Sequence, residues 1–313
     1  MQLHLGYEGV PPAGRGAAVA LGNFDGVHLG HRAVLDAART EAARLGAPLG
    51  VLTFEPHPRS FFQPDAPPFR LTSPRTKADL LAAAGVDWLY QASFDRAFAA
   101  HDPEAFATEV LRDGLGASAV ICGYDFVFGK GRLGNTKVLE ALGKRLGFAV
   151  TVVAPARNGD AAYSSTVIRG LLQDGKPREA AEMLGHRWTI EGEVRTGDAR
   201  GRTIGFPTAN IELGPFLVPA LGVYAVRAGL EAADGSHAWR PAVANLGRRP
   251  TFDKRDVLLE VHLIDFQGDL YGRRLWVEFV EYIRPERKFS GLDALKAQIS
   301  ADRDKAKEIL TTI

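Results

Sequence analysis

The chain has 313 residues, a formal net charge of +1 and an apolar content of 46%. This length is enough for two domains of ordinary size, and the apolar content is enough for each to bury a core. The near-zero charge argues against the basic surface by which nucleic acids and anionic membranes are bound. The single cysteine, Cys122, excludes an intramolecular disulfide, and no apolar run approaches the roughly 20 residues of a membrane span. Residues 1–6 lack the basic and apolar pattern of a signal peptide, so the sequence predicts a cytoplasmic protein.

Up to about Gly185, strand-like and helix-like segments alternate along the chain. Short runs rich in branched apolar residues predict strands, and apolar residues at helical spacing predict helices between them. The alternation predicts a parallel sheet with helices on both faces. The predicted strands are residues 17–21, 49–54, 119–122 and 149–153, and the predicted helices are residues 32–45, 78–84, 135–146 and 177–184, with another helix beginning at Asp102-Pro103.

From about His186 the pattern changes. Short runs of branched and aromatic residues are separated by Gly, Pro and Asp turns, and a single helical period closes the chain near residues 292–310. Several short strands with turn signals predict an antiparallel barrel or sandwich. The predicted strands are residues 188–194, 222–228, 242–245, 258–264 and 275–282.

The most informative stretch is a glycine-rich turn at residues 22–31, Gly-Asn-Phe-Asp-Gly-Val-His-Leu-Gly-His, between the first predicted strand and helix. In this context glycines let the backbone approach a phosphate closely, and the helix start offers unpaired N–H groups. His28 and His31 are three residues apart, so both can face one ligand. The pattern favours a site that binds and polarises a nucleoside triphosphate, although an isolated His-x-x-His is as often a pair of surface histidines.

Three other segments follow predicted strands. The carboxyl ends of parallel strands meet at one edge of a sheet, so these segments are expected near the glycine-rich turn. They are Thr53–Pro58, Gly123–Arg132 and Ser164–Arg169, the last with hydroxyls at a helix start and an arginine one turn later. Hydroxyls, helix amides and a guanidinium suit a departing pyrophosphate. Each segment alone is also compatible with an ordinary loop or N-cap, so their joint placement carries the prediction.

The second half contains two candidate features. A Gly/Arg-rich loop at residues 197–205 leads into a turn where Thr208 and Asn210 present a hydroxyl and an amide. Such oxygen ligands suit Mg²⁺, which is held by few protein groups together with phosphates. Glu260 is a candidate carboxylate base for an attacking hydroxyl. Taken without other information, strand alternation favours a solvent-facing Glu260, and the turn remains compatible with a plain barrel connection.

Two motifs of the first half, His-x-Gly-His at residues 28–31 and Ser-Ser-Thr-x-Ile-Arg at residues 164–169, resemble those of the nucleotidyltransferase superfamily. The wider pattern, with Thr-Phe-x-Pro-His-Pro at 53–58 and Gly-Tyr-Asp-Phe-x-Phe-Gly at 123–129, is similar to the adenylyltransferase half of bacterial bifunctional riboflavin kinase/FAD synthetases. The resemblance implies that His28 and His31 are catalytic. It implies ATP contacts from Gly22, Asn23, Phe24, Asp25, Gly26, Gly30, Ser164, Ser165, Thr166 and Arg169. It implies flavin contacts from Phe54, Pro56, His57, Pro58, Phe62, Tyr124, Asp125 and Phe128.

The second half resembles riboflavin kinases, with Pro-Thr-Ala-Asn at residues 207–210 and Asn-Leu-Gly-Arg-Arg-Pro-Thr-Phe at residues 245–252 in the expected order. The resemblance implies that Glu260 is the catalytic base and that Thr208 and Asn210 hold magnesium. It implies ATP contacts from Gly197, Arg200, Gly201, Arg202, Gly205, Phe206 and Pro207.

Together the motif sets imply a Rossmann-like nucleotidyltransferase domain with a parallel sheet over residues 1–185. They imply a six-stranded antiparallel β-barrel riboflavin kinase domain with a terminal helix over residues 186–313. The implied function is phosphorylation of riboflavin by ATP to FMN, then adenylylation of FMN by ATP to FAD and pyrophosphate, with Mg²⁺ as the metal.

The expected partners are therefore riboflavin, FMN and ATP, without nucleic acid or membrane, and a homo-oligomer is left open. One other interpretation is a nucleotidyltransferase acting on a different phosphate ester, with the barrel as a binding module. A nucleic-acid-binding barrel is a further alternative, which the net charge of +1 disfavours.

Overall fold

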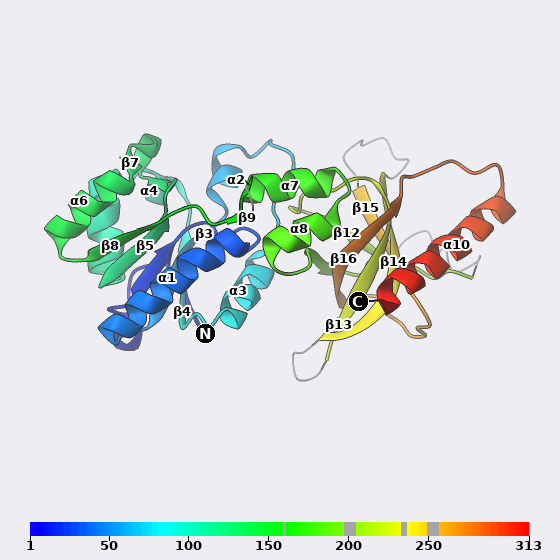
Figure 1. Cartoon of the computed structure of the whole chain (residues 1–313), viewed down its shortest axis with the longest axis horizontal. Coiled ribbons are helices and arrows are strands. Elements are labelled where there is room, and N and C mark those ends of the chain that lie inside the picture. The colour runs from blue at the N-terminus through cyan, green and yellow to red at the C-terminus, as the bar shows by residue number, and fades with distance from the viewer. Residues whose placement is uncertain (159–160, 197–204, 233–236, 249–256, 313) are drawn as a thin grey trace. The chain divides into compact units, whose positions relative to one another are not determined.

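The computed structural model describes residues 1–158, 161–196, 205–232, 237–248 and 257–312 (Figure 1). The chain forms two compact units, Met1–Ala66 with Pro74–Ser164, and Pro67–Ser73 with Ser165–Ile313. A division into compact units need not coincide with a division into functional domains. The domain boundary predicted at residues 185–186 therefore stays a prediction.

The first unit is built on a six-stranded sheet in the order β1-β4-β3-β2-β5-β8, in which every pairing is parallel, as predicted. Its strands are β1 (Gln2–Leu5), β2 (Ala18–Leu21), β3 (Leu49–Glu55), β4 (Trp88–Ser93), β5 (Ala119–Gly123) and β8 (Ala149–Val153). Two hairpins pair β6 (Val127–Phe128) with β7 (Gly134–Asn135), and β9 (Arg157–Asn158) with β10 (Ala161–Ala162). The strands β1 and β4 were not predicted.

The helices of this unit include α1 (Leu29–Leu45), α2 (Pro58–Phe62), α3 (Pro74–Ala83), α4 (Arg96–Ala99), α5 (Pro103–Ala105) and α6 (Thr136–Leu146). Two 3₁₀ turns, η1 (Pro12–Gly14) and η3 (Lys130–Arg132), and a π-helix, η2 (Phe106–Gly114), complete the unit. As predicted, Asp102 caps α5, because its side chain accepts a hydrogen bond from the Ala105 N–H at 2.8 Å.

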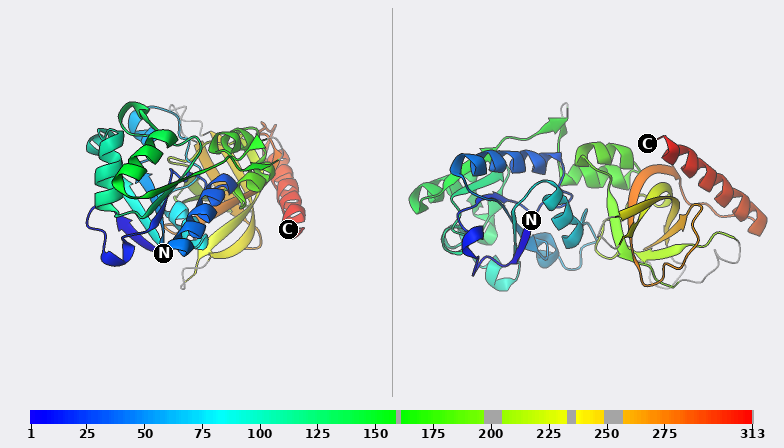
Figure 2. Two further views of the ribbon diagram at one scale, coloured as in Figure 1. Left: turned by 60° about the vertical axis from the view of Figure 1, so that its left-hand side comes forward. Right: turned by 90° about the horizontal axis from the view of Figure 1, so that it is seen from below.

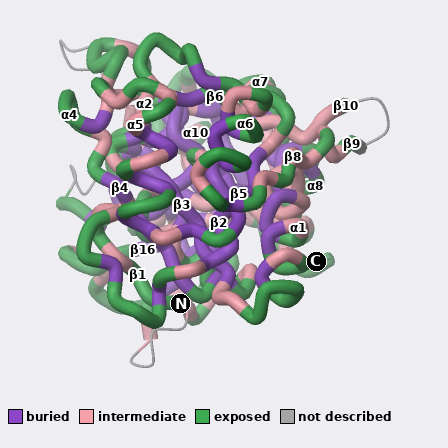
Figure 3. Tube along the Cα trace, turned by 90° about the vertical axis from the view of Figure 1, so that its left-hand side faces the viewer, coloured by how far each residue is buried: buried purple, intermediate pink, exposed green. Residues whose placement is uncertain are grey.

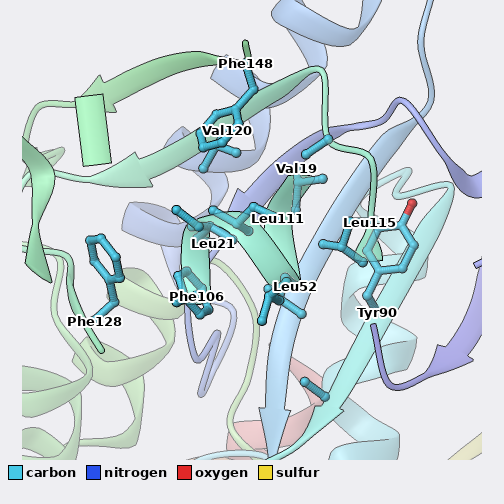
Figure 4. Close-up of a cluster of buried hydrophobic side chains, with 14 of the residues drawn as sticks. Val19, Leu21, Leu52, Tyr90, Phe106, Leu111, Leu115, Val120, Phe128 and Phe148 are labelled. Atoms are coloured by element: carbon cyan, nitrogen blue, oxygen red, sulfur yellow. The ribbon is translucent and has the colours of Figure 1, made fainter. Parts of the chain in front are cut away.

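The sheet has a hydrophobic core on each face, as the predicted double layer of helices requires. Successive residues of β2 alternate between the cores: Val19 and Leu21 face one, and Ala18 and Ala20 face the other. The first core is completed from η2 and α6 and includes the side chains of Figure 4. The second core is completed from α1 and α3. In Figure 3 the central strands β2 and β3 are correspondingly drawn as buried.

The second unit is a six-stranded antiparallel sheet in the order β11-β16-β13-β14-β15-β12. The Arg195 N–H donates to the Asn210 carbonyl at 2.9 Å, which brings β12 to the end of β11 and nearly closes the barrel (Figure 2). This confirms the predicted six-stranded barrel. Its strands are β11 (Thr189–Glu193), β12 (Ala209–Glu212), β13 (Gly222–Glu231), β14 (His237–Arg248), β15 (Val257–Leu263) and β16 (Arg274–Arg284).

Among the residues that the structure describes in this half, the helices are α7 (Ser165–Gln173), α8 (Pro177–Leu184) and the terminal helix α10 (Leu292–Thr311). The terminal helix is attached to β16 by an ion pair, in which the Arg284 guanidinium donates to Asp302 at 2.7 and 2.9 Å. Gln298, one turn before Asp302, donates to the same carboxylate at 2.7 Å. Both partners of the ion pair are largely shielded from water, so removing either one would leave the other charge buried without its partner.

A short segment from early in the sequence, Pro67–Ser73, also belongs to the second unit. The Trp188 indole donates to the Leu71 carbonyl at 2.9 Å, and Arg70 exchanges backbone hydrogen bonds with Pro215 and Leu217. These bonds satisfy backbone groups of a loop beside the barrel, so the segment is a structural part of this unit.

Candidate active sites

The glycine-rich turn joins β2 to α1 in a strained backbone conformation. Phe24, Gly26 and Val27 have positive φ angles of 50°, 88° and 39°. A β-branched residue such as Val27 rarely adopts this conformation. The side chains of Phe24 and Val27 are each 1% exposed, and the Val27 N–H donates to the Phe24 carbonyl at 3.2 Å. Burial therefore holds the turn in a shape that isolated residues would not choose.

The turn delivers two histidines to the start of α1. His28 is the N-cap, and its Nδ1 accepts a hydrogen bond from the His31 N–H at 3.2 Å. The two rings stack, with centroids 3.6 Å apart and planes 18° apart. The prediction that both histidines gather at one place is confirmed. Imidazoles beside a helix N-terminus form an arrangement suited to phosphate groups.

Gly30 leaves the space that this arrangement needs. A Cβ at this position would lie 3.0 Å from the His28 ring and 3.1 Å from the Tyr163 carbonyl oxygen. Either neighbour would have to shift to admit a side chain. The glycine therefore determines how closely the histidine pair and the chain at Tyr163 can approach.

The predicted flavin residues fall into two groups. Phe62 and Tyr124 are exposed, by 64% and 52%, whereas Phe54 and Phe128 are buried in the hydrophobic core. An exposed aromatic ring can stack on a planar ligand, whereas the two core rings pack on other phenylalanines. Of the remaining predicted residues, Pro56, His57 and Pro58 follow the end of β3, and the exposed Asp125 lies in the turn after β5. His57 caps α2, because its ring accepts a hydrogen bond from the Arg59 N–H at 3.0 Å.

The motif at residues 164–169, which is predicted to bind phosphate, divides between the two units. Ser164 ends the first unit, whereas Ser165, Thr166 and Arg169 lie on α7 of the second. Within the second unit, the Arg169 Nε donates to the Phe69 carbonyl at 2.8 Å, and its guanidinium lies 5.4 Å from the centre of the Phe69 ring.

On the barrel, the strand register places the predicted base beside two amides. Glu260 of β15 is paired with Asn210 of β12 on one side and with Asn245 of β14 on the other. The Asn245 Nδ2 donates to the Glu260 carboxylate at 3.4 Å. Leu259 and Val261 are buried and Glu260 is half-buried, so the predicted alternation is confirmed.

A second carboxylate lies close to Glu260. Burial and then the negative charge of Glu260 raise the pKa of Glu286 above its usual range, while Arg248 and Arg284 oppose this rise. Glu286 follows β16 and was not predicted as a site residue. The surroundings of Glu260 therefore combine two amides with a like charge.

A pocket of about 280 Å³ opens beside the predicted magnesium ligands. Pro207, Thr208 and Asn210 line one part of it, and residues 266–271 line another. The His262 Nδ1 lies 2.8 Å from the Pro207 carbonyl oxygen and is the donor, since a carbonyl can only accept. This bond fixes the position of Pro207 in the pocket lining. The sequence indicated a turn at residues 207–210, but strand β12 begins at Ala209, since its alternating apolar residues continue the barrel.

The predicted ATP contacts of this half are described only in part. Gly197, Arg200, Gly201 and Arg202 lie outside the described residues. Gly205 has a φ of 89°, a conformation that favours glycine, and the Phe206 ring lies 5.5 Å from that of His262. Sequence reasoning missed residues 266–271 as pocket lining, although their Gly and Asp content indicated a loop between strands.

Comparison with known proteins assigns each half separately. A family model described as FAD synthetase matches residues 10–167, and one described as riboflavin kinase matches residues 184–310. The bifunctional riboflavin kinase/FMN adenylyltransferase of Escherichia coli strain K12 is 42% identical over 94% of this chain and 92% of its own length. That of Haemophilus influenzae is 41% identical over 98% of both chains.

The chain belongs to the bifunctional riboflavin kinase/FMN adenylyltransferase family. The relative from Bacillus subtilis is 38% identical over 93% of this chain and 91% of its own length. A crystal structure named as that of a macrolide-efflux protein from Streptococcus pneumoniae is 30% identical and covers 97% of this chain and 98% of its own, with a TM-score of 0.85. Among the helices that the structure describes, none is long and apolar enough to cross a membrane.

The family assignment confirms the resemblance found in the sequence. Both histidines, the strained turn and Ser164 to Thr166 fall within the FAD synthetase match, while Thr208, Asn210 and Glu260 fall within the riboflavin kinase match. Each matched segment thus contains its own group of candidate catalytic side chains.

Proposed function

We propose that this chain makes FMN at the barrel site and FAD at the glycine-rich turn, with the residue roles given below. The activities are those of its family, riboflavin kinase and FMN adenylyltransferase, so riboflavin, FMN and ATP are its substrates. One observation supports assigning one reaction to each site. Glu260 with its neighbouring amides lies in the riboflavin kinase match, and the stacked His28–His31 pair lies in the FAD synthetase match.

In the kinase step, Glu260 accepts the proton of the ribityl 5′-hydroxyl as that oxygen attacks the γ-phosphorus of ATP. The bond from the γ-phosphorus to the β,γ-bridging oxygen breaks, and the products are FMN and ADP. The hydrogen bond from Asn245 to the Glu260 carboxylate supports this role, because it orients the acceptor oxygen on the barrel. Positioning and charge neutralisation supply most of the rate in phosphoryl transfer.

Thr208 and Asn210 would hold the magnesium ion. Their hydroxyl and amide oxygens are hard donors, and both residues line the pocket, whose lining does not include Glu260. Asn210 is nevertheless the strand partner of Glu260. Magnesium binds few protein groups and completes its shell with water and phosphate oxygens, so this small donor set fits it. When bound, the ion neutralises phosphate charge during transfer.

In the adenylyltransferase step, an FMN phosphate oxygen attacks the α-phosphorus of ATP, and pyrophosphate leaves with the α,β-bridging oxygen. His28 and His31 stabilise the charge that grows on the phosphates, with the first amides of α1 beside them. Exposed Phe62 and Tyr124 are the candidates for stacking on the flavin ring. Contacts of Ser165 and Arg169 with the pyrophosphate remain a prediction from the motif.

The motifs imply no covalent enzyme intermediate in either step, because they suggest no activated nucleophile such as a Ser–His pair. The one cysteine of the chain, Cys122, is buried in the core of the first unit, and burial raises the pKa of its thiol to about 12. A thiol that stays protonated is a poor nucleophile. We also retain the prediction of a cytoplasmic location, supported by the family's soluble substrates.

The testing experiment incubates the purified chain with riboflavin, ATP and Mg²⁺ and follows the flavins by chromatography. FMN is expected first and FAD after it. FMN without FAD contradicts the role of the histidine turn, and unchanged riboflavin contradicts the kinase assignment. Supplying FMN directly separates the second reaction from the first.

A further inference from the structure

A buried lysine lies behind the glycine-rich turn. Lys77 belongs to α3, and its side chain is 1% exposed. Its Nζ donates to the Glu55 carboxylate at 2.7 Å, the Thr53 hydroxyl at 3.0 Å and the Asn23 carbonyl at 3.4 Å. An ammonium group has three N–H donors, which these three oxygens match. A buried charge is costly unless it is paired and hydrogen-bonded, so the position of this lysine requires a specific explanation.

The three oxygens come from two segments of the candidate site. Asn23 belongs to the glycine-rich turn, and Thr53 and Glu55 end β3, immediately before the predicted flavin segment Pro56–Pro58. The Thr53 hydroxyl also donates to the Asn23 carbonyl, at 3.2 Å. One ammonium group therefore bonds to both segments, and one carbonyl accepts from two side chains.

The turn needs such an anchor because its backbone is strained. Asn23 immediately precedes Phe24, whose φ is 50°, and Val27 follows with a φ of 39°. Residues in these conformations persist only where their surroundings over-determine the backbone. The buried side chains of Phe24 and Val27 fix the turn by packing, and the hydrogen bonds to the Asn23 carbonyl fix its main chain.

We propose that Lys77 is a positioning residue of the adenylyltransferase site. It fixes the Asn23 carbonyl and, through the strained turn, the placement of His28 and His31. It acts through the backbone and touches neither substrate, since its side chain is buried. The inference rests on the proposed function of the turn. It predicts that loss of the ammonium slows FAD formation more than it weakens substrate binding.

The test compares Lys77→Met with the unaltered chain in both reactions. A misplacement of about 1 Å can cost on the order of 100-fold in rate, so kcat for FAD formation from supplied FMN and ATP is expected to fall about 10- to 100-fold. The KM for FMN is expected to change less than kcat. Riboflavin phosphorylation by the same molecules is the internal control and is expected to stay unchanged.

Two further variants keep the test informative if Lys77→Met folds poorly. Lys77→Met combined with Glu55→Gln removes the carboxylate that would otherwise be buried without its cation. Lys77→Arg keeps the charge and is expected to restore part of the kcat. Rates are measured at a temperature where circular dichroism shows each variant to be folded. Lys144→Met, at an exposed position on α6, is the matched control and is expected to change neither reaction.

The outcomes separate this inference from the function on which it rests. If folded Lys77→Met or the double variant forms FAD at the normal kcat, the lysine only stabilises the fold and the proposal is overturned. Equal losses in both reactions overturn it as well. His31→Ala is assayed beside them. If FAD formation survives that change, the proposed role of the turn fails. If His31→Ala loses FAD formation while the Lys77 variants keep it, only the role of Lys77 fails.

Discussion

The two candidate sites are held by different kinds of structure. In the first unit, the histidine pair depends on a strained turn whose shape is set by a glycine and by buried neighbours. On the barrel, Glu260 takes its place from the register of three paired strands. A turn can be displaced by a single methyl group, whereas a ladder of backbone hydrogen bonds holds its register when one side chain changes. The first site should therefore be sensitive to backbone changes, and the second to the chemistry of individual side chains.

The largest expected effect is on the barrel, from Glu260→Gln. The amide keeps the shape of the side chain but cannot act as a base, and general base catalysis contributes about 10²- to 10⁴-fold. FMN formation is expected to fall by that factor, while FAD formation from supplied FMN continues. Glu182→Gln, on the exposed surface of α8, is the control. A variant that still phosphorylates riboflavin at the normal rate would remove Glu260 from the mechanism.

Gly30→Ala makes the complementary change in the first unit. Its Cβ would meet the His28 ring and the Tyr163 carbonyl oxygen at about 3 Å, so one of these neighbours must shift by a few tenths of an ångström. FAD formation is expected to fall about 10- to 100-fold, because catalysis depends steeply on position, and riboflavin phosphorylation is expected to persist. Gly291→Ala, where no atom lies within 4 Å of the new Cβ, should leave FAD formation intact. Normal FAD synthesis by Gly30→Ala would show that neither the His28 ring nor the chain at Tyr163 has to keep its close approach.

Asn245→Ala sharpens the argument for the strand ladder. It removes the hydrogen bond to Glu260 but leaves the backbone pairing of β14 with β15. Loss of one hydrogen bond of about 1 to 1.5 kcal/mol predicts a roughly tenfold lower kcat for FMN formation. The KM for riboflavin should change by no more than about twofold, because the lost bond acts on the base and not on the bound substrate. A rise in KM with unchanged kcat would place Asn245 in substrate binding instead.

The smallest expected effect is that of His262→Phe. Phenylalanine keeps an aromatic ring against Phe206 but cannot donate to the Pro207 carbonyl. Loss of about 1 kcal/mol from the pocket lining predicts a rise in the KM for ATP of about fivefold in the kinase reaction. Steady-state kinetics with varied ATP measures this, and an unchanged KM would show that the bond does not shape the ATP site.

Local sequence signals predicted most elements of both units. Gly46 and Gly147 end α1 and α6 with positive φ angles, and Asn135 caps α6 by accepting from the Val138 N–H. Such ends follow from the conformational freedom of glycine and from side-chain capping, which are local properties. Helix α8 likewise ends before Gly185, whose φ is positive, and both α8 and strand β8 have the predicted bounds.

What could not be predicted depends on contacts between distant residues. Strand β12 continues a segment that resembled a turn, because its pairing with β15 is not visible in its own short sequence. In a sequence, the buried Lys77 is indistinguishable from a solvent-facing lysine of an amphipathic helix. The burial of Phe54 and Phe128, likewise, is set by the core into which they fold rather than by their neighbours in the chain.

The segment Pro67–Ser73 gives the molecule a topology that a string of two domains would not have. The chain passes from one compact unit to the other, returns, and passes over again after Ser164. No single cut of the polypeptide therefore yields both units whole: a fragment that begins at residue 186 lacks the Leu71 carbonyl to which its Trp188 indole is bonded. An ancestor assembled by joining two genes end to end would have had to acquire this interleaving afterwards.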